Sequence, residues 1–421
     1  MKPTWTDNNR LRLLENGEAF FPRVFEVIAA ARHEVIVETF ILFDDPVGRG
    51  LHKALLSAAE NGATVHLVVD GYGSPDLPIE FIRSLTEAGV HFHSWDPQPT
   101  LLGIRTNLFR RLHRKIVVVD EQRAFVGGIN YAEDHLRRAG PQSKQDFAVE
   151  LQGPVVEQIR GYCLEQLGRD PRSTPMSVLR RWTDWPRRLL ARRRRADAQV
   201  LFCVRDNDHH PRAIEEQYRQ AIRAAREEVV LMNAYFFPSW SFLRDLRRAA
   251  RRGVRVVVVV QGTPDKAYVK WAASSLYDML LNAGVQVYEY SERPLHGKIA
   301  VIDGHWSTVG SSNLDPLSLA LNLEANVCIR DREFSGALRE RVQELLRDCC
   351  RRVGRDQVPR QRGWRHLLRS LIYHLLRRFP AWSEGLGRRR QQLRQLMPGR
   401  AAVADENAQQ PSPHEKPRRA A

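Results

Sequence analysis

Short apolar runs alternate with longer amphipathic stretches along most of this chain. The first series reads EVIVETFIL (34–42), RGLHKALLSAAEN (49–61), TVHLVVD (64–70), PIEFIRSLTEAG (78–89) and VHFHSW (90–95). The β-branched runs predict strands, and the stretches with apolar residues at steps of three and four predict helices. Alternation of this kind favours an α/β fold in which helices flank a mixed, largely parallel sheet.

The same series of elements occurs a second time. AARHEVIVETFI (30–41) matches AAREEVVLMNAYF (224–236), GATVHLVVDG (62–71) matches GVRVVVVVQG (253–262), and EAGVHFHSWD (87–96) matches NAGVQVYEYS (282–291). So long a period indicates a duplicated domain, because the repeats of a solenoid are several times shorter. We expect two pseudo-two-fold-related domains at 1–168 and 199–350, joined by a basic linker or excursion at 169–198.

The net charge of +16 is concentrated outside these two domains. Residues 351–421 carry +12 and residues 169–195 carry +8, which leaves −4 for the remainder. A mildly acidic body argues against a nucleic-acid partner. We expect the two basic segments, rather than the body, to be attracted to an anionic surface. The five cysteines form no CxxC pair, which favours reduced thiols in a cytosolic protein. We find no signal peptide and no apolar run of bilayer length.

The pattern His-x-Lys-x-x-x-x-Asp also occurs twice, once in each expected domain. LHRKIVVVD contains His113, Lys115 and Asp120, and LHGKIAVID contains His296, Lys298 and Asp303. On a strand, residues two apart project to one face, so each histidine points the same way as its lysine. The aspartates complete the motif, but they lie seven residues from the histidines and would repel a phosphate. We therefore expect both aspartates to have a structural role.

A loop of small residues follows each motif at the same distance. GGIN (127–130) and GSSN (310–313) resemble loops whose backbone N–H groups bind anions, and an asparagine amide is a further donor. We expect Asn130, Asn313 and Ser311 to bind a phosphate.

Two HxKxxxxD motifs in one chain resemble the phospholipase D superfamily, and the resemblance covers residues 1–350. HRKIVVVDEQRAFVGGINYAEDH (113–135), KQDFAVELQGPVVEQI (144–159) and GSSNLDPLSLALNLEAN (310–326) are similar to bacterial cardiolipin synthases, most of all to the peripheral B type. The resemblance implies two phospholipase D-like domains with one active site between them. It implies phosphatidyl transfer between two phosphatidylglycerol molecules, which yields cardiolipin and glycerol.

The resemblance also implies a role for each residue of the site. His113 would attack phosphorus to form a phosphohistidine, while His296 would act as general acid and then as general base. Lys115 and Lys298 would stabilise the charge of the transition state. Asp146 and Glu324 would orient the imidazoles crosswise, Glu324 on His113 and Asp146 on His296. Neither a cofactor nor a metal is expected.

Three alternatives remain at this point. Water could be the acceptor, as in a phospholipase or a nuclease. Phosphatidylethanolamine or glycerol could replace one phosphatidylglycerol. A non-catalytic membrane scaffold is the third reading, and intact motifs count against it.

A basic amphipathic helix is expected at 363–380, within a membrane-surface segment at 351–397. The residues expected to bind an anionic phospholipid membrane are Trp364, Leu368, Leu371, Leu375, Arg369 and Arg377. The alternative is a helix that packs on the protein's own core. The linker stretch 179–195 is a second membrane contact or a solvated arm. Residues 398–421 are expected to be disordered. We expect a peripheral protein on the cytoplasmic face of the bacterial inner membrane.

Overall fold

The computed structural model describes residues 3–74, 77–97, 100–101, 104–105, 111–169, 198–262, 276–357 and 393–396. The expected membrane helix, with Trp364, Leu368, Arg369, Leu371, Leu375 and Arg377, lies outside the described residues, as do the tail and nearly all of the expected linker. No helix in the described part of the chain is long and apolar enough to cross a membrane.

The N-terminal half contains the strands and helices that the sequence pattern predicts, together with several shorter ones. Its strands are β1 (Trp5–Glu15), β2 (Glu34–Thr39), β3 (Thr64–Asp70), β4 (His91–Trp95), β5 (Thr100–Leu101), β6 (Ile104–Arg105), β7 (Ile116–Val119), β8 (Arg123–Gly127) and β9 (Phe147–Gln152). Its helices are α1 (Asn16–Ala29), α2 (Pro46–Glu60), α3 (Ile79–Glu87), α4 (Pro154–Gln166) and the 3-10 turns η1 (Glu133–His135) and η2 (Arg137–Gln142).

The C-terminal half has the corresponding elements. Its strands are β10 (Ala198–Arg205), β11 (Glu228–Asn233), β12 (Arg255–Gln261), β13 (Gln286–Tyr290), β14 (Lys298–Ile302), β15 (Trp306–Gly310), β16 (Glu324–Arg330) and β17 (Cys350–Arg352). Its helices are α7 (Ala213–Ala224), α8 (Trp240–Arg251), α10 (Pro316–Ala320), α11 (Arg332–Asp348) and the 3-10 turn η3 (Arg355–Gln357).

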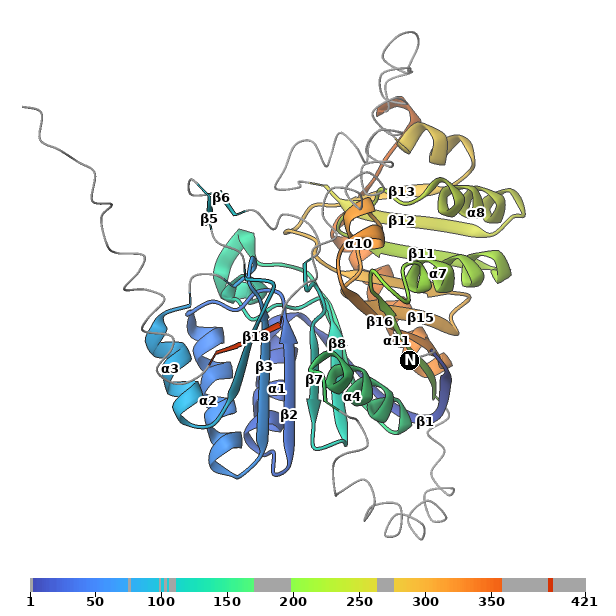
Figure 1. Ribbon diagram of the computed structural model, residues 1–421. Coiled ribbons are helices and arrows are strands. Elements are labelled where there is room, and N and C mark those ends of the chain that lie inside the picture. The colour runs from blue at the N-terminus through green and yellow to red at the C-terminus, as the bar shows by residue number, and fades with distance from the viewer. Residues whose placement is uncertain are drawn as a thin grey trace, which may run out of the picture.

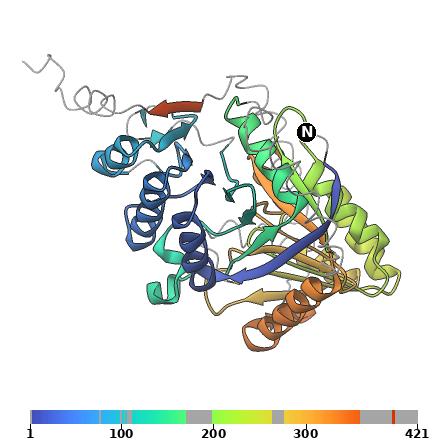
Figure 2. The ribbon, with the colours of Figure 1, turned by 90° about the horizontal axis from the view of Figure 1, so that it is seen from below.

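All the described strands except β5 and β6, which pair with each other, join in one 16-stranded sheet whose order has two-fold symmetry. The order is β17-β13-β12-β11-β14-β15-β16-β10-β1-β9-β8-β7-β2-β3-β4-β18, in which β18 is Leu393–Leu396. The antiparallel pair β1–β10 lies at the centre, and corresponding strands of the duplicated domains follow in the same order on either side. Figure 2 shows β1, in dark blue, running from one half to the other. The pseudo-two-fold relation expected from the repeat is confirmed.

The outermost strand β18 (Leu393–Leu396) comes from the segment that we expected at a membrane surface. It pairs antiparallel with β4, so this part of 351–397 extends the sheet of the N-terminal half.

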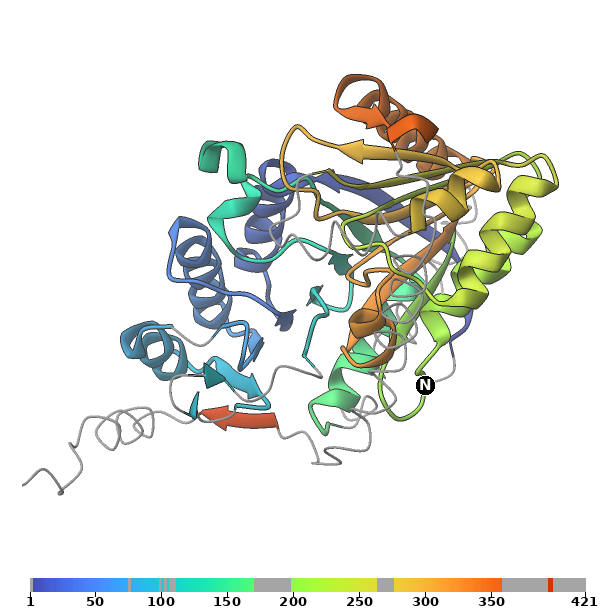
Figure 3. The same cartoon turned by 90° about the horizontal axis from the view of Figure 1, so that it is seen from above.

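Apart from a small cluster of Val68, Leu112 and Leu323, the core of the described part of the chain lies in three large clusters. One fills the space between the two halves and includes residues of α4 and α11 together with the inner faces of both parts of the sheet. The other two lie under the outer helices, α1 to α3 on one flank and α7 with α8 on the opposite flank (Figure 1). Figure 3 shows these helices, in blue and in yellow-green, on opposite sides of the molecule. The two halves therefore share an apolar core.

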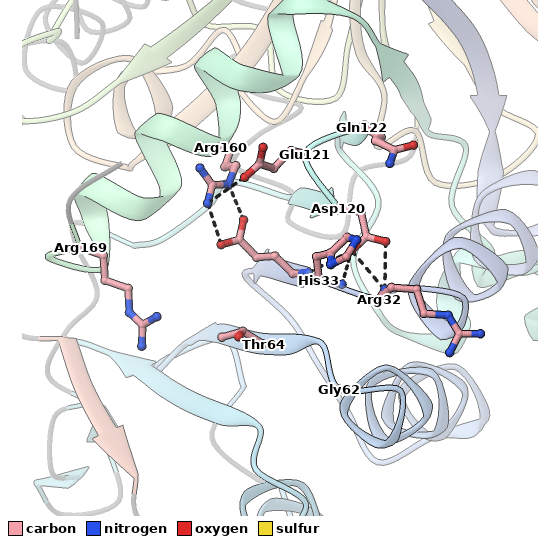
Figure 4. A pocket seen from close by; sticks show the side chains of 10 residues that line it. Arg32, His33, Gly62, Thr64, Asp120, Glu121, Gln122, Arg160 and Arg169 are labelled. Atoms are coloured by element: carbon pink, nitrogen blue, oxygen red, sulfur yellow. Dashed lines mark hydrogen bonds and ion pairs between the residues drawn. The ribbon is translucent and has the colours of Figure 1, made fainter. Parts of the chain in front are cut away.

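The motif aspartates support the fold at the end of β7 and β14 that is remote from the histidines. The Asp303 carboxylate accepts the backbone N–H groups of Arg226, Glu227 and Glu228 at 2.8 to 2.9 Å. The Asp120 carboxylate likewise accepts the N–H groups of Arg32, His33 and Glu34, where β2 begins. These residues line a pocket of about 280 Å³. Figure 4 shows Asp120 bonded to this segment. The carboxylates have the structural contacts that we expected.

We expect Asp303→Asn to destabilise the fold by about 1 to 3 kcal/mol at neutral pH, because an amide replaces a charged acceptor of three N–H groups. Asparagine tolerates the positive φ of 50° at this position, so the backbone should not be strained. Burial would raise the pKa of Asp303, but the three N–H donors outweigh it and lower that pKa below its usual value. Its contribution is therefore present above about pH 4 and is lost as the pH falls through the lowered pKa.

Urea unfolding of wild type and Asp303→Asn at several pH values measures this difference. Asp208→Asn, in an exposed turn, is the control for loss of one negative charge. Equal stability of the two variants at neutral pH would show that the Asp303 contacts contribute nothing.

Candidate active site

The two motif histidines lie where the segments that lead into β7 and β14 meet the opposite half of the protein. The His113 N–H donates to the Leu323 carbonyl at 2.9 Å, and the His296 N–H donates to the Gln145 carbonyl at 2.8 Å. Isolated parallel bridges beside these bonds join Leu112 to Leu323 and Gln145 to Leu295. Each histidine is therefore hydrogen-bonded to a residue of the other half, and that residue directly precedes Glu324 or Asp146.

The two acids contact the histidines in the crosswise order that the resemblance implied. His113 Nδ1 lies 3.0 Å from Glu324 Oε2, and His296 Nδ1 lies 2.5 Å from Asp146 Oδ2. Both carboxylates are fully buried. Because a carboxylate accepts a hydrogen bond, each imidazole carries its proton on Nδ1, and Nε2 keeps a free lone pair. Two imidazoles in this state can accept a proton or attack an electrophile.

The motif lysines are buried beside the histidines. Lys115 Nζ donates to the His113 carbonyl at 2.7 Å, and Lys298 Nζ donates to the His296 carbonyl. An ammonium group has three donors, so each lysine has further donors for the oxygens of a phosphate. Burial lowers the pKa of Lys115 to about 7 and that of Lys298 to about 8, although nearby carboxylates oppose it.

Burial also controls the charge of the imidazoles and of their acids. It lowers the pKa of His113 to about 4, against the opposing effect of Glu324, and it lowers the pKa of His296 well below the usual value. Burial raises the pKa of Asp146. It would raise the pKa of Glu324 too, but His113, Lys115 and a hydroxyl outweigh it, so that pKa is lowered. Without a bound anion, both imidazoles are therefore neutral at physiological pH.

The hydroxyl group that donates to Glu324 belongs to Ser311, a residue that we expected to bind the phosphate. Ser311 Oγ donates to Glu324 Oε2 at 2.5 Å and accepts the Ala325 N–H at 3.0 Å, and the side chain is fully buried. The Ser311 N–H donates to the Ala325 carbonyl at 3.0 Å. The structure thus places Ser311 on the acid that orients His113, with its hydrogen bonds already made.

The two loop asparagines differ from one another. Asn130 is buried, its Oδ1 accepts the Ile41 N–H at 3.3 Å, and its own N–H donates to His135 Nε2 at 3.3 Å. Asn313 is also buried, and its Oδ1 has no hydrogen-bond partner among the described residues. The N–H groups of Gly128, Ser311 and Ser312 are occupied by the protein, so the anion-binding backbone that we expected is largely absent from these parts of the loops.

Sequence reasoning missed His135, a fully buried neighbour of His296. The two rings meet edge to face with their centroids 5.4 Å apart, and His135 Nδ1 has no hydrogen-bond partner in the described part of the chain. The position equivalent to His135 in the second half is Ser318. Comparison of the two halves therefore could not identify His135, because the second half has a serine at the matching position.

His135, Asp146 and His296 could hold a metal ion by their spacing, since one ligand atom of each lies within 4.8 Å of the others. Two nitrogens and one carboxylate oxygen suit zinc or a similar ion. Two of these three groups, Asp146 and His296, are hydrogen-bonded to each other, which explains their proximity without an ion.

Phe40 and Arg111 also line the site and were missed. The Phe40 ring lies 5.0 Å from the His113 ring, 5.3 Å from Lys115 Nζ and 5.8 Å from the Arg111 guanidinium carbon. The Phe40 ring thus lies close to all three of these side chains, which belong to the N-terminal half.

Known proteins share both the sequence and the architecture of this chain. Residues 24–159 and 218–346 match the family described as "Cardiolipin synthase, PLD-like domain". Cardiolipin synthase B of Escherichia coli (strain K12) is 50% identical over 383 residues, which cover 90% of this chain and 91% of the relative. Cardiolipin synthase A of Pseudomonas aeruginosa (strain LESB58) is 36% identical over 336 residues, or 78% of this chain and 65% of the relative.

Solved structures agree on the fold. The phosphatidylserine synthase of Haemophilus influenzae Rd KW20 superposes with a TM-score of 0.64 at 14% identity, over 89% of this chain and 93% of its own. A polyphosphate kinase from Porphyromonas gingivalis gives 0.55 over 89% of this chain and 53% of its own. Such low identity establishes the architecture alone, whereas the matches above extend to the sequence around both histidines. The chain therefore belongs to the cardiolipin synthase family of phospholipase D-like proteins.

Proposed function

We propose that this protein is a phosphatidyltransferase that makes cardiolipin and glycerol from two molecules of phosphatidylglycerol. The observation that carries the proposal is the pair of imidazoles, each oriented by a buried acid from the opposite half and each beside a buried lysine. Each half of the protein supplies one imidazole to this site. Covalent exchange at a phosphodiester needs two such groups, a nucleophile and a proton carrier. Relatives named cardiolipin synthase supply the substrate class.

In the proposed reaction, His113 Nε2 attacks the phosphorus of the first lipid and the bond to its glycerol headgroup breaks. His296 delivers a proton to the departing glycerol oxygen. It then removes a proton from a hydroxyl of the second lipid, whose oxygen attacks the phosphohistidine and breaks the phosphorus–nitrogen bond. An anionic phosphate in the site raises the pKa of the buried imidazoles, which allows His296 to hold the proton that it must deliver.

Lys115 and Lys298 stabilise the transition state in this scheme. The charge on the non-bridging oxygens of phosphorus grows as the nucleophile attacks, and buried ammonium groups act there in a medium of low dielectric constant. Binding of the same anion raises the lowered pKa of each lysine, so that both are charged when the reaction occurs.

We also propose that the protein works at the surface of an anionic membrane, on the cytoplasmic face of the bacterial inner membrane. Phe43, Trp240 and Leu317 are 41 to 42% exposed and are the exposed large apolar side chains of the described residues. Phe43 donates its N–H to the Tyr131 carbonyl beside Asn130, while Leu317 follows Asn313 closely. Exposed large apolar side chains favour contact with lipid. The amphipathic stretch 363–380 adds a second contact in this proposal.

Mass spectrometry of lipids tests the proposed function directly. We expect the purified full-length protein to convert vesicles of phosphatidylglycerol to cardiolipin and free glycerol, and His113→Ala to give neither. Phosphatidic acid in place of cardiolipin would show that water is the acceptor, so that the protein is a phospholipase. Cardiolipin formed only after phosphatidylethanolamine is added would move the donor or acceptor to that lipid.

A further inference from the structure

Arg111 is a cation at the active site that the reaction scheme above does not use. It lies two residues before His113, and its guanidinium carbon is 4.1 Å from the centre of the Tyr72 ring. The same group also approaches the Phe40 ring that contacts His113 and Lys115. Stacking on two rings orients a planar guanidinium while leaving its N–H groups available for an anion.

The charge of Arg111 is not neutralised by a direct ion pair within the described part of the chain. Its Nε is buried and has no hydrogen-bond partner there. Asp70 is an acid whose pKa the charge of Arg111 lowers, and its carboxylate already accepts the backbone N–H groups of Tyr72, Gly73 and Leu112 at 2.7 to 2.9 Å. Arg111 is partly buried, and a buried N–H group of a cation that lacks a partner is costly unless a ligand accepts its hydrogen bond.

This cation breaks the symmetry of the site. The position two residues before His296 holds Pro294, and the neighbouring Arg293 of the second half donates to the Gln145 side chain. The proposed chemistry has a matching asymmetry. Two lipids meet in the site, but only one phosphorus reacts, and the phosphodiester of the acceptor lipid must lie beside the reacting one.

We infer that Arg111 binds the phosphodiester of the acceptor lipid, as a second phosphate subsite beside the histidines and lysines. Residues 111–113 are extended, because Leu112 bridges Leu323, so the side chains of Arg111 and His113 start about 6.6 Å apart on one face. A glycerol of three carbons separates the two phosphates of cardiolipin, which suits neighbouring subsites of this kind. The inference rests on the proposed function, since it takes phosphatidylglycerol as the acceptor.

A competition between two acceptors tests the subsite. Wild type, Arg111→Gln and Arg111→Lys are incubated as full-length proteins with phosphatidylglycerol vesicles and a fixed concentration of ethanol. Ethanol has no phosphate, so transfer to it yields phosphatidylethanol without using the subsite, whereas transfer to phosphatidylglycerol yields cardiolipin. Both products come from one phosphohistidine, so their ratio does not depend on the amount of folded enzyme.

We expect Arg111→Gln to lower the ratio of cardiolipin to phosphatidylethanol by about 10- to 100-fold, the loss typical of one hydrogen bond to a charged group. Arg111→Lys should recover part of the ratio because it keeps the charge. Arg83→Gln, on the exposed side of α3, controls for weaker attraction to anionic vesicles and should leave the ratio unchanged.

An unchanged ratio in Arg111→Gln would overturn the inference, whether both products fell together or neither fell. Failure of the proposed function would look different. Wild type would then make phosphatidylethanol but no cardiolipin, whatever the variant did.

Discussion

Replacement of His113 or His296 by alanine is expected to lower cardiolipin formation by about 10⁴-fold or more, because each removes a group that makes or breaks a bond or moves a proton. His113 is buried and His296 is partly buried, and each is held at Nδ1 by an acid from the other half, so neither can take over the position of the other. Initial rates of glycerol release measure the loss. His305→Ala is the matched control, since His305 is exposed at the opposite end of β14. Turnover above about 1% of wild type in either variant would contradict the assignment.

A lipid with a p-nitrophenyl headgroup separates the two roles. p-Nitrophenolate leaves without a proton, so His296→Ala should release it in a burst and accumulate the phosphohistidine, whereas His113→Ala should remain inactive. The reverse result would exchange the roles of nucleophile and acid. The near-symmetry of the site makes this the decisive comparison for the order of the histidines.

Replacement of the orienting acids is expected to have the second largest effect. Glu324→Gln and Asp146→Asn should each lower turnover by about 10²- to 10⁴-fold, because an amide cannot hold the imidazole in the same tautomer or stabilise its protonated form. The loss should appear in kcat much more than in KM, since neither acid is placed to contact the lipid. Steady-state kinetics with mixed micelles of phosphatidylglycerol give both constants.

Two controls accompany the acid variants. Glu60→Gln removes one exposed carboxylate from the end of α2 and should leave turnover unchanged. Ser311→Ala removes the hydroxyl that donates to Glu324 and should have a smaller effect, about tenfold, because it acts through that acid. Full activity of Glu324→Gln would mean that the 3.0 Å contact with His113 is not used in catalysis.

Much of this architecture follows from local patterns in the sequence. The runs EVIVETFIL and TVHLVVD became β2 and β3 because β-branched residues suit a strand buried on both faces, and all but one of the side chains in these two strands are buried. The repeat predicted the pseudo-two-fold order of strands. The two motifs located His113, Lys115, His296 and Lys298 without knowledge of any contact.

Other features depended on contacts that no local pattern encodes. Ser311 was expected at the phosphate, but the pairing of β15 with β16 brings its hydroxyl to Glu324. His135 and Arg111 were not predicted, because comparison of the two halves detects only residues that both halves share. Their counterparts in the second half are Ser318 and Pro294.

By itself, the sequence determined the strands, the helices, the duplication and the histidine–lysine pairs, since each depends on residues close together in the chain. The tertiary structure alone decided how the halves meet. The β1–β10 pair joins them into one sheet, and the bridges at Leu112 and Leu295 then bring acids and histidines 150 to 211 residues apart into hydrogen-bond distance. Such pairing is set by the packing of two apolar sheet faces over a common core, and that packing leaves no periodic signal along the chain.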